Sequence, residues 1–407
     1  MPRVEPLAYR AEVRGGSKLV LGAVLAFTGC QDDDSSPPAS GESSSTGSAS
    51  GPGSSSGAMG SSDETGGEPS PYDGEPLSIV RDGTWHWFDI DGMQCADGRP
   101  SGVGVRAVED SAGLVLYFKG GGACFNASTC GLSAPLMLTG FEAIEENPHG
   151  VLDFEAADNP LAGYDVVYFP YCTGDVHGGT VPQVSVPGVD DPWDFVGHDN
   201  VAHALERLGP TFADASRLLV LGTSAGGIGA LVNVPQIALG WPQAETMVLD
   251  DSGMIFRDPY LAPCLQRQMR DHWGLADSLP DDCPACETAD GGGMAQYFTY
   301  LAERYPQTRF GVVASTRDQI VRIFFGYGND ECDPGSGLPD LGAEVLEAAL
   351  VDLRTEVLGD RYATYVLDSD QHTWTATPQF YDAQSGGVML SAWFEAFLAG
   401  DATNVEP

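Results

Sequence analysis

Seven short apolar runs, separated by segments with helical spacing, constrain the fold of this 407-residue chain more than any other feature. Several runs are continuous blocks of β-branched and aromatic residues, as expected of strands that are covered on both faces. Amphipathic segments at 195–208, 228–239 and 344–358 lie between them. The alternation predicts an α/β fold with a mostly parallel central sheet flanked by helices. The expected strands are 102–108, 114–118, 165–169, 217–222, 246–250, 310–315 and 363–368.

In open sheets of this kind, functional residues lie beyond the carboxyl ends of the strands. The run RLLVLG leads into TSAGG, so that Gly222 to Gly226 reads G-x-S-x-G around Ser224. This motif predicts a nucleophile elbow, a strained turn whose small residues let strand and helix approach closely. The glycines also resemble a dinucleotide-binding loop, but their spacing differs from that of short-chain dehydrogenases and no lysine follows a tyrosine by four residues. A P-loop is excluded because Gly-Lys-Ser/Thr does not occur.

Three other strand ends add the remaining parts of a hydrolase site. The run LVLYF is followed by KGGGACFN, whose glycines expose backbone N–H groups suited to an oxyanion hole. Asp318 follows the run FGVVAS and His372 follows ATYVLD, which gives the Ser, acid, His chain order of α/β-hydrolases. In that arrangement the histidine takes the serine proton and the acid fixes the histidine tautomer. The acid is open at this stage, because Asp250 and Asp251 follow an earlier strand, with Asp330 and Glu331 as further candidates.

Residues 1–30 are typical of an export signal. A basic segment precedes the apolar LVLGAVLAF, which is too short to span a membrane as a helix. The small pair before Cys30 resembles a bacterial lipobox, which implies a lipid on Cys30, and Gln31 then favours the outer membrane; simple secretion is the alternative. Residues 31–75 are rich in Ser, Gly and Pro and predict a disordered linker. The expected catalytic domain covers residues 76–407.

Eight cysteines remain besides Cys30, and an even number in an exported chain favours disulfide bonds. They are Cys95, Cys124, Cys130, Cys172, Cys264, Cys283, Cys286 and Cys332. The C-x-x-C of Cys283 and Cys286 lies in a polar loop, unlike a redox motif, and no Cys/His pair has zinc-ligand spacing. We therefore expect no metal and no cofactor. The net charge of −39 disfavours nucleic acid as a partner, and we expect a monomer.

Taken in order, these blocks resemble the pectin acetylesterase/Notum family of serine carboxylesterases. The matching stretches cover roughly residues 85 to 395 and read YFKGGGACFNASTC, VVYFPYCTGDVHGG, GTSAGGIGALVNV, LDDSG, Asp318-Gln319 and QHTW. The resemblance implies that Ser224 is the nucleophile, His372 the base and Asp318 the acid. It also implies that the N–H groups of Gly121, Gly122 and Ala225 form the oxyanion hole, although the family usually has an aromatic residue where Gly122 stands.

The resemblance carries two further expectations. Asp175 and His177, in YCTGDVHGG, lie beyond another strand end and are expected to line the substrate cleft; hydrogen bonding within the loop is the alternative. Cys124 is implied to pair with Cys130, and Cys95 with Cys172. The other four cysteines allow three connectivities.

The function implied by the resemblance is hydrolysis of esters by an exported or surface-anchored enzyme. Family members remove acetyl groups from plant polysaccharide or a lipid acyl group from a secreted protein. We expect O-acyl esters with a short acyl group, O-acetyl first, with polysaccharide as one carrier. De-esterified pectin is disfavoured because it is a polyanion, like this chain. The alternatives are a secreted polyester depolymerase or lipase-like esterase, and an inactive hydrolase fold that only binds.

Overall fold

The computed structural model describes residues 70–137, 141, 148–332 and 339–407. The expected signal, Cys30 and most of the expected linker lie outside the described residues. Within the described part, packing begins with Tyr72, whose hydroxyl donates to the Gln236 carbonyl (2.8 Å) and whose ring contacts the core. Packing thus begins a few residues before the expected boundary at 76, because this aromatic ring is one of the few apolar groups of the segment.

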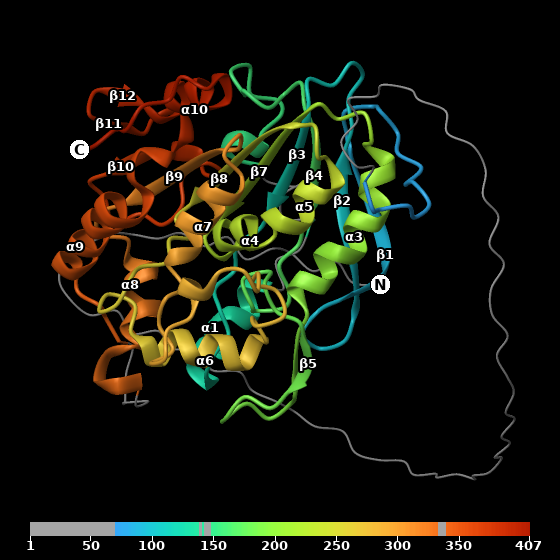
Figure 1. The fold of residues 1–407 in the computed structure, drawn as a ribbon. Helices are drawn as coiled ribbons and strands as arrows, with labels where there is room; N and C mark the ends of the chain where they lie inside the picture. Colours follow the sequence, from blue (N-terminus) through green and yellow to red (C-terminus); the bar gives the residue numbers. More distant parts are fainter. Residues whose placement is uncertain (1–69, 138–140, 142–147, 333–338) are drawn as a thin grey trace, which may run out of the picture. The chain divides into compact units, whose positions relative to one another are not determined.

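An eight-stranded sheet lies at the centre, in the order β1-β2-β4-β3-β7-β8-β9-β10 (Figure 1). Strand β2 is antiparallel to β1 and β4, and the pairs from β4 to β10 are parallel, which confirms the mostly parallel sheet. The strands are β1 Trp85–Gln94, β2 Pro100–Arg106, β3 Leu114–Phe118, β4 Asp165–Phe169, β7 Arg217–Thr223, β8 Glu245–Asp251, β9 Arg309–Ser315 and β10 Tyr362–Leu367. Two small hairpins pair β5 Val181–Val184 with β6 Trp193–Phe195, and β11 Gln384–Ser385 with β12 Val388–Met389.

Helices cover both faces of the sheet. Successive strand residues point to opposite sides. Leu116 and Phe118 of β3 belong to one core with α3 to α7 and α9, whereas Val115 and Tyr117 belong to a second core with α10. Figure 1 accordingly shows α10 on one side of the sheet and α3, α4 and α5 on the other. The helices are α1 Ala127–Met137, α3 Gly197–Thr211, α4 Ala225–Val232, α5 Val234–Gly240, α6 Pro263–Trp273, α7 Gln296–Arg304, α8 Gln319–Gly326, α9 Ala343–Leu353 and α10 Leu390–Ala399.

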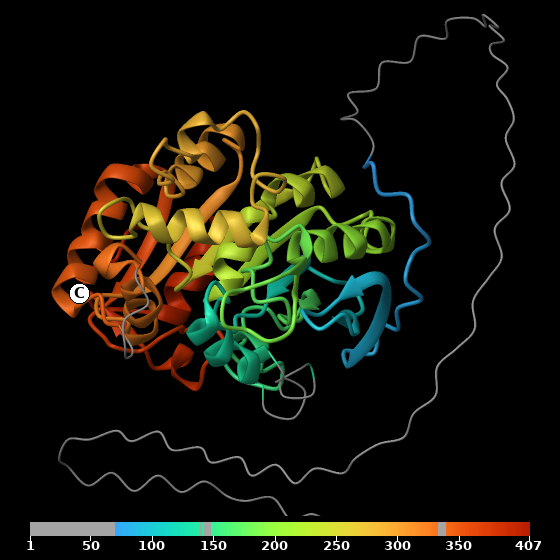
Figure 2. The same ribbon diagram turned by 90° about the horizontal axis from the view of Figure 1, so that it is seen from below.

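The parallel register brings the chemically interesting turns to one edge of the sheet. Gly222 lies opposite both Phe118 and Asp250, and Leu367 lies opposite Ser315. The turns after β3, β7, β8, β9 and β10 therefore lie side by side. Figures 1 and 2 show α1, α6 and α8 beyond this edge, with α6 (yellow in Figure 2) running across it.

Four disulfide bonds join the eight cysteines. Cys95 pairs with Cys172 and Cys124 with Cys130, the two pairs that the family resemblance implied. The other bonds join Cys264 to Cys332 and Cys283 to Cys286. In the part of the chain that the structure describes, no helix has the length and apolar character needed to cross a bilayer, and no cluster of His, Cys, Asp and Glu is arranged to hold a metal ion.

Candidate active site

Ser224 occupies the tight turn between β7 and α4. Its φ is 57° and its ψ is −126°, a conformation that non-glycine residues rarely adopt and that recurs at functional sites. The turn is held from both sides: the Ser224 N–H donates to the Asp251 carbonyl (2.7 Å), and the Ser224 carbonyl accepts from the Gly227 N–H (2.8 Å). The strained serine of the predicted elbow is therefore present.

The glycines of the motif are required by close packing. A Cβ atom on Gly222 would lie 1.8 Å from the Gly226 carbonyl oxygen, and one on Gly226 would lie 2.0 Å from that of Phe118. Neither oxygen belongs to a flexible side chain. The sequence keeps glycine here because strand β7, helix α4 and the end of β3 touch through their backbones, as in a nucleophile elbow.

His372 meets Asp318, not Asp250 or Asp251. The ring Nδ1 lies 2.7 Å from Asp318 Oδ2, while Asp318 Oδ1 accepts from the N–H groups of Ile320 (2.9 Å) and Val321 (3.0 Å) at the start of α8. A carboxylate only accepts, so that Nδ1 carries the hydrogen and Nε2 is left as an acceptor. Nε2 is buried and has no hydrogen-bond partner among the described residues.

The two alternative acids after β8 have other partners, whereas the side chains of Asp330 and Glu331 lie outside the described part of the chain. Asp251 Oδ2 accepts from the backbone N–H groups of Trp374 (2.8 Å) and Thr375 (2.7 Å) and from the Thr375 hydroxyl (2.7 Å). Asp250 Oδ1 accepts from the Gly253 N–H (2.7 Å), and burial raises the pKa of Asp250 to about 8. Asp251 thus anchors the loop that carries His372, but it does not contact the histidine ring.

The segment after β3, residues 119–124, is called the glycine loop below. It passes directly against the serine, because a Cβ on Gly120 would lie 2.8 Å from the Ser224 Cβ. Gly122 has a φ of 83°, and a Cβ on it would meet the buried Ser133 hydroxyl at 2.5 Å. The aromatic residue usual in the family at this position has no room in this conformation. Gly121, Gly122 and Ala225 all lie on pocket walls that also contain Ser224.

Two pockets meet at Ser224 and His372. The first is narrow, with a free volume of about 60 Å³, and its strongly apolar lining comes from distant segments, including Met254, Ile255, Met269, Trp273, Phe324 and Phe325. The second is larger, with a free volume of about 520 Å³, and its wall mixes apolar groups with Lys119, His149, Thr223 and Thr373. Burial lowers the pKa of Lys119 to about 8. An ester whose carbonyl lies at Ser224 would extend one arm into each pocket.

Asp175 and His177 lie on the wall of neither of these two pockets, and their contacts are those of the alternative, hydrogen bonding within the loop. Both are buried. Asp175 accepts from the Thr173 hydroxyl (2.6 Å) and from the N–H groups of His177 (3.1 Å) and Gly197 (2.7 Å). The ring of His177 donates through Nε2 to the Lys119 carbonyl (2.9 Å). Burial raises the pKa of Asp175 to about 6 and lowers that of His177 to about 4. The turn after β4 folds underneath the glycine loop instead of opening into the cleft.

Comparison with known proteins shows which family this chain resembles. The sequence model described as pectinacetylesterase matches residues 85–304. The palmitoleoyl-protein carboxylesterase NOTUM of Mus musculus is 31% identical over 173 residues, which are 40% of this chain and 33% of the relative. The NOTUM of Drosophila melanogaster is 26% identical over 209 residues, 47% of this chain and 31% of the relative. The match thus spans about a third of the length of these curated relatives.

The fold also has a solved counterpart. The structure of the Wnt deacylase Notum from Drosophila covers 79% of this chain and 95% of its own, with a TM-score of 0.61 and 19% identity. At this identity the likeness concerns the fold alone. It agrees with the eight-stranded, mostly parallel sheet and its flanking helices, and the fold is α/β-hydrolase-like.

Proposed function

The chain belongs to the pectinacetylesterase family, and on that premise we propose that it is a serine carboxylesterase with Ser224 as nucleophile, His372 as base and Asp318 as orienting acid. The observation that carries the proposal is the 2.7 Å contact of His372 Nδ1 with Asp318 at a pocket whose wall also holds the strained Ser224. The names of the relatives, which are carboxylesterases, support the same reaction class.

Acylation follows from the roles of the three side chains. His372 Nε2 takes the hydroxyl proton as Ser224 Oγ bonds to the ester carbonyl carbon. The carbonyl oxygen becomes an oxyanion that accepts from the N–H groups of Gly121, Gly122 and Ala225. The C–O bond to the alcohol then breaks, and the alcohol leaves with the proton from His372. Asp318 stabilises the imidazolium, and its position at the N-terminus of α8 favours its negative charge.

Deacylation repeats these steps with water. His372 removes a proton from a water molecule whose oxygen attacks the acyl carbonyl, and the proton passes to Ser224 Oγ as its bond to the acyl group breaks. The products are a carboxylic acid and the free enzyme. The atoms and protons of both steps balance with the three side chains, the ester and water alone.

The linings of the two pockets suggest which one binds the acyl group of the ester and which one binds the alcohol. We assign the apolar pocket to the acyl group because its lining offers almost nothing to hydrogen-bond a polar alcohol. Its free volume of about 60 Å³ has room for roughly four to six groups the size of a water molecule, so that a short acyl chain such as butyryl still fits, longer than the acetyl group expected from the sequence. The open second pocket then receives the alcohol, for which a sugar unit of a polysaccharide remains a candidate.

A fluorophosphonate probe and a panel of p-nitrophenyl esters test the reaction class. The wild-type protein should hydrolyse the esters and acquire the probe on Ser224, and Ser224→Ala should do neither. If Ser224→Ala hydrolyses the esters as fast as the wild-type protein, the proposed mechanism is wrong. A folded wild-type protein that the probe does not label would favour a fold that only binds.

The same panel tests the acyl-chain assignment. Each buried methylene contributes about 0.8 kcal/mol, so that going from acetyl to butyryl should raise kcat/KM by roughly 15-fold. A maximum at acetyl would instead restore the acetylesterase interpretation. Hydrolysis of polymer film in preference to soluble esters would identify a polyester depolymerase.

We also propose that residues 1–30 direct export, that Cys30 carries a lipid, and that residues 31–75 tether the catalytic domain to the outer membrane. Four disulfide bonds support an oxidising compartment. Mass spectrometry of the mature N-terminus decides between a lipidated Cys30 and simple secretion, with Cys30→Ser as the control.

A further inference from the structure

The glycine loop is held by two side chains from the segment that follows β4. The Tyr171 hydroxyl donates to the Gly122 carbonyl (2.8 Å), and His177 Nε2 donates to the Lys119 carbonyl (2.9 Å). These two carbonyls flank the peptide units whose N–H groups, on Gly121 and Gly122, are the proposed oxyanion donors. The loop is therefore fixed on both sides of its functional atoms.

We propose that Tyr171 and His177 are positioning residues that hold the glycine loop in the conformation in which its N–H groups meet the oxyanion. This inference rests on the proposed function and adds residues that touch neither substrate nor Ser224. Each acts through a backbone carbonyl.

The glycine loop needs side chains that hold it in place because it is rich in glycine. Consecutive glycines rotate freely about φ and ψ, and an oxyanion hole works only if its donors are already aligned. Packing restricts the loop from two sides: a Cβ on Gly120 would lie 2.3 Å from the Thr223 carbonyl, and one on Gly121 would lie 2.6 Å from the Tyr171 ring. The Tyr171 ring thus packs against the loop at Gly121, and its hydroxyl fixes the orientation of the peptide between Gly122 and Ala123.

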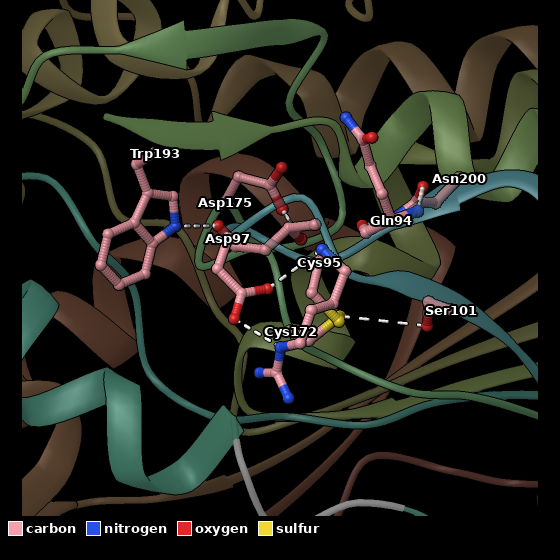
Figure 3. Close-up of a disulfide and its surroundings, with 10 residues drawn as sticks. Gln94, Cys95, Asp97, Ser101, Cys172, Asp175, Trp193 and Asn200 are labelled. Atoms are coloured by element: carbon pink, nitrogen blue, oxygen red, sulfur yellow. Dashed lines mark hydrogen bonds and ion pairs between the residues drawn. A yellow bond between two sulfur atoms is a disulfide. The ribbon is translucent and has the colours of Figure 1, made fainter. Parts of the chain in front are cut away.

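The segment that holds the glycine loop is itself fixed by hydrogen bonds and a disulfide bond. Tyr171 Oη accepts from the Val176 N–H (2.9 Å), which closes the segment on itself. His177 has a φ of 58°, and the Asp175 carboxylate accepts its N–H. Figure 3 shows the disulfide bond that joins Cys172 to Cys95, the residue directly after β1. The indole N–H of Trp193 donates to the carbonyl of Thr173, next to Cys172 (2.7 Å).

His177 also connects the glycine loop to α4, the helix that follows Ser224. A Cβ on Gly229 of α4 would lie 2.8 Å from the His177 ring, and the His177 carbonyl accepts from the Asn233 side chain (3.0 Å). One imidazole therefore packs on α4 and bonds the glycine loop. A carbonyl partner requires hydrogen on Nε2, and burial, which lowers the pKa of His177 to about 4, keeps the ring neutral in that tautomer at neutral pH.

The test compares variants that differ in the donor alone. His177→Met and His177→Gln have unbranched side chains of similar length and meet the same backbone φ, but only Gln retains an N–H for the Lys119 carbonyl. We expect His177→Met to lower kcat about 10- to 100-fold with KM within about threefold, and His177→Gln to recover most of that loss. Tyr171→Phe keeps the ring and should lower kcat in the same range.

Tyr362→Phe is the matched control. Tyr362 is a buried tyrosine whose hydroxyl also donates to a carbonyl at 2.8 Å, that of Phe298, and it lies on neither pocket wall. This variant should retain wild-type kcat. The proposal is overturned if Tyr171→Phe lowers kcat no more than Tyr362→Phe, or if His177→Gln is no better than His177→Met.

Hydrogen–deuterium exchange of the peptide covering the glycine loop tests the same contacts without substrate. Exchange should be faster in His177→Met and Tyr171→Phe than in wild type or Tyr362→Phe, and equal rates would overturn the proposal. An active Ser224→Ala variant would instead refute the proposed function while leaving this comparison valid. The two failures are therefore distinguishable.

Discussion

At the scale of single residues, Asp318 differs from the other carboxylates by the atoms it faces. One of its oxygens is occupied by two backbone N–H groups and the other by the histidine ring. We predict that Asp318→Asn lowers kcat by about 10⁴-fold, because the amide donates to Nδ1 and forces the wrong tautomer. Steady-state kinetics checks this, with Asp250→Asn as a folded control. Comparable losses in both variants would show that charge, not contact with His372, matters.

Asp250 gives a prediction about stability, since burial raises its pKa to about 8. An aspartate in the unfolded chain titrates near pH 3.9. Between about pH 4 and pH 8 the folded protein therefore holds a proton that the unfolded chain has released, and the free energy of unfolding falls as pH rises. Asparagine does not titrate and keeps the oxygen that accepts from Gly253. Asp250→Asn should exceed the wild-type Tm by a few degrees at pH 8, and the gap should close toward pH 4. A pH-independent gap would contradict this.

The sequence predicts single residues well where chain order carries the information. Ser224 and His372 each follow a predicted strand, and parallel strands end at a common edge, so their proximity could be anticipated. Asp175 and His177 also follow a strand, but nothing in their spacing says whether the turn opens into the cleft or folds beneath it. The lining of the apolar pocket was not predicted either. Met254, Met269 and Phe324 are ordinary apolar residues that only the tertiary fold brings together.

At the scale of elements, the nucleophile elbow forms only because the backbones of β7 and α4 are in direct contact. A Cβ on Gly222 would lie 1.8 Å from a backbone oxygen that cannot move without displacing α4. We predict that Gly222→Ala lowers the free energy of unfolding by about 3 kcal/mol or more and reduces Ser224 labelling. Gly131→Ala is the control, because a Cβ there meets nothing within 4 Å and it lies in α1. That variant should be neutral or up to about 1 kcal/mol more stable. Denaturant unfolding measures both.

Elements were predicted where periodicity is unambiguous. All seven expected strands are present, and 114–118 and 165–169 match β3 and β4 residue for residue. Strand β1 was missed because it is an antiparallel edge strand with exposed charges and a glycine, which lacks the continuous apolar signal. The expected helix 228–239 is two helices, α4 and α5, because Pro235 at the start of α5 lacks the N–H that a continuous helix needs.

At the scale of the whole molecule, the net charge is opposite in sign to the local charge in the second pocket. The chain has a net charge of −39, yet Lys119 lies on the wall of the pocket assigned to the alcohol. The long-range field repels anionic substrates, while the nearby Lys119 cation attracts them. Because the Debye length is about 30 Å at 0.01 M salt and about 10 Å at 0.1 M, added salt weakens the distant field before the local contacts.

This difference predicts how salt affects two esters with the same acyl group, one with a neutral and one with a carboxylate-bearing alcohol. For the anionic ester, kcat/KM should rise about three- to tenfold between 0.01 M and 0.3 M salt, mainly through KM, while the neutral ester changes little. Lys119→Met should steepen the rise, because it removes the local positive charge and leaves the global field. If kcat/KM for the anionic ester falls with added salt, the attraction by the positive charge in the pocket is stronger than the repulsion by the net charge of the whole chain. The net charge would then no longer count against a polyanionic polysaccharide as substrate.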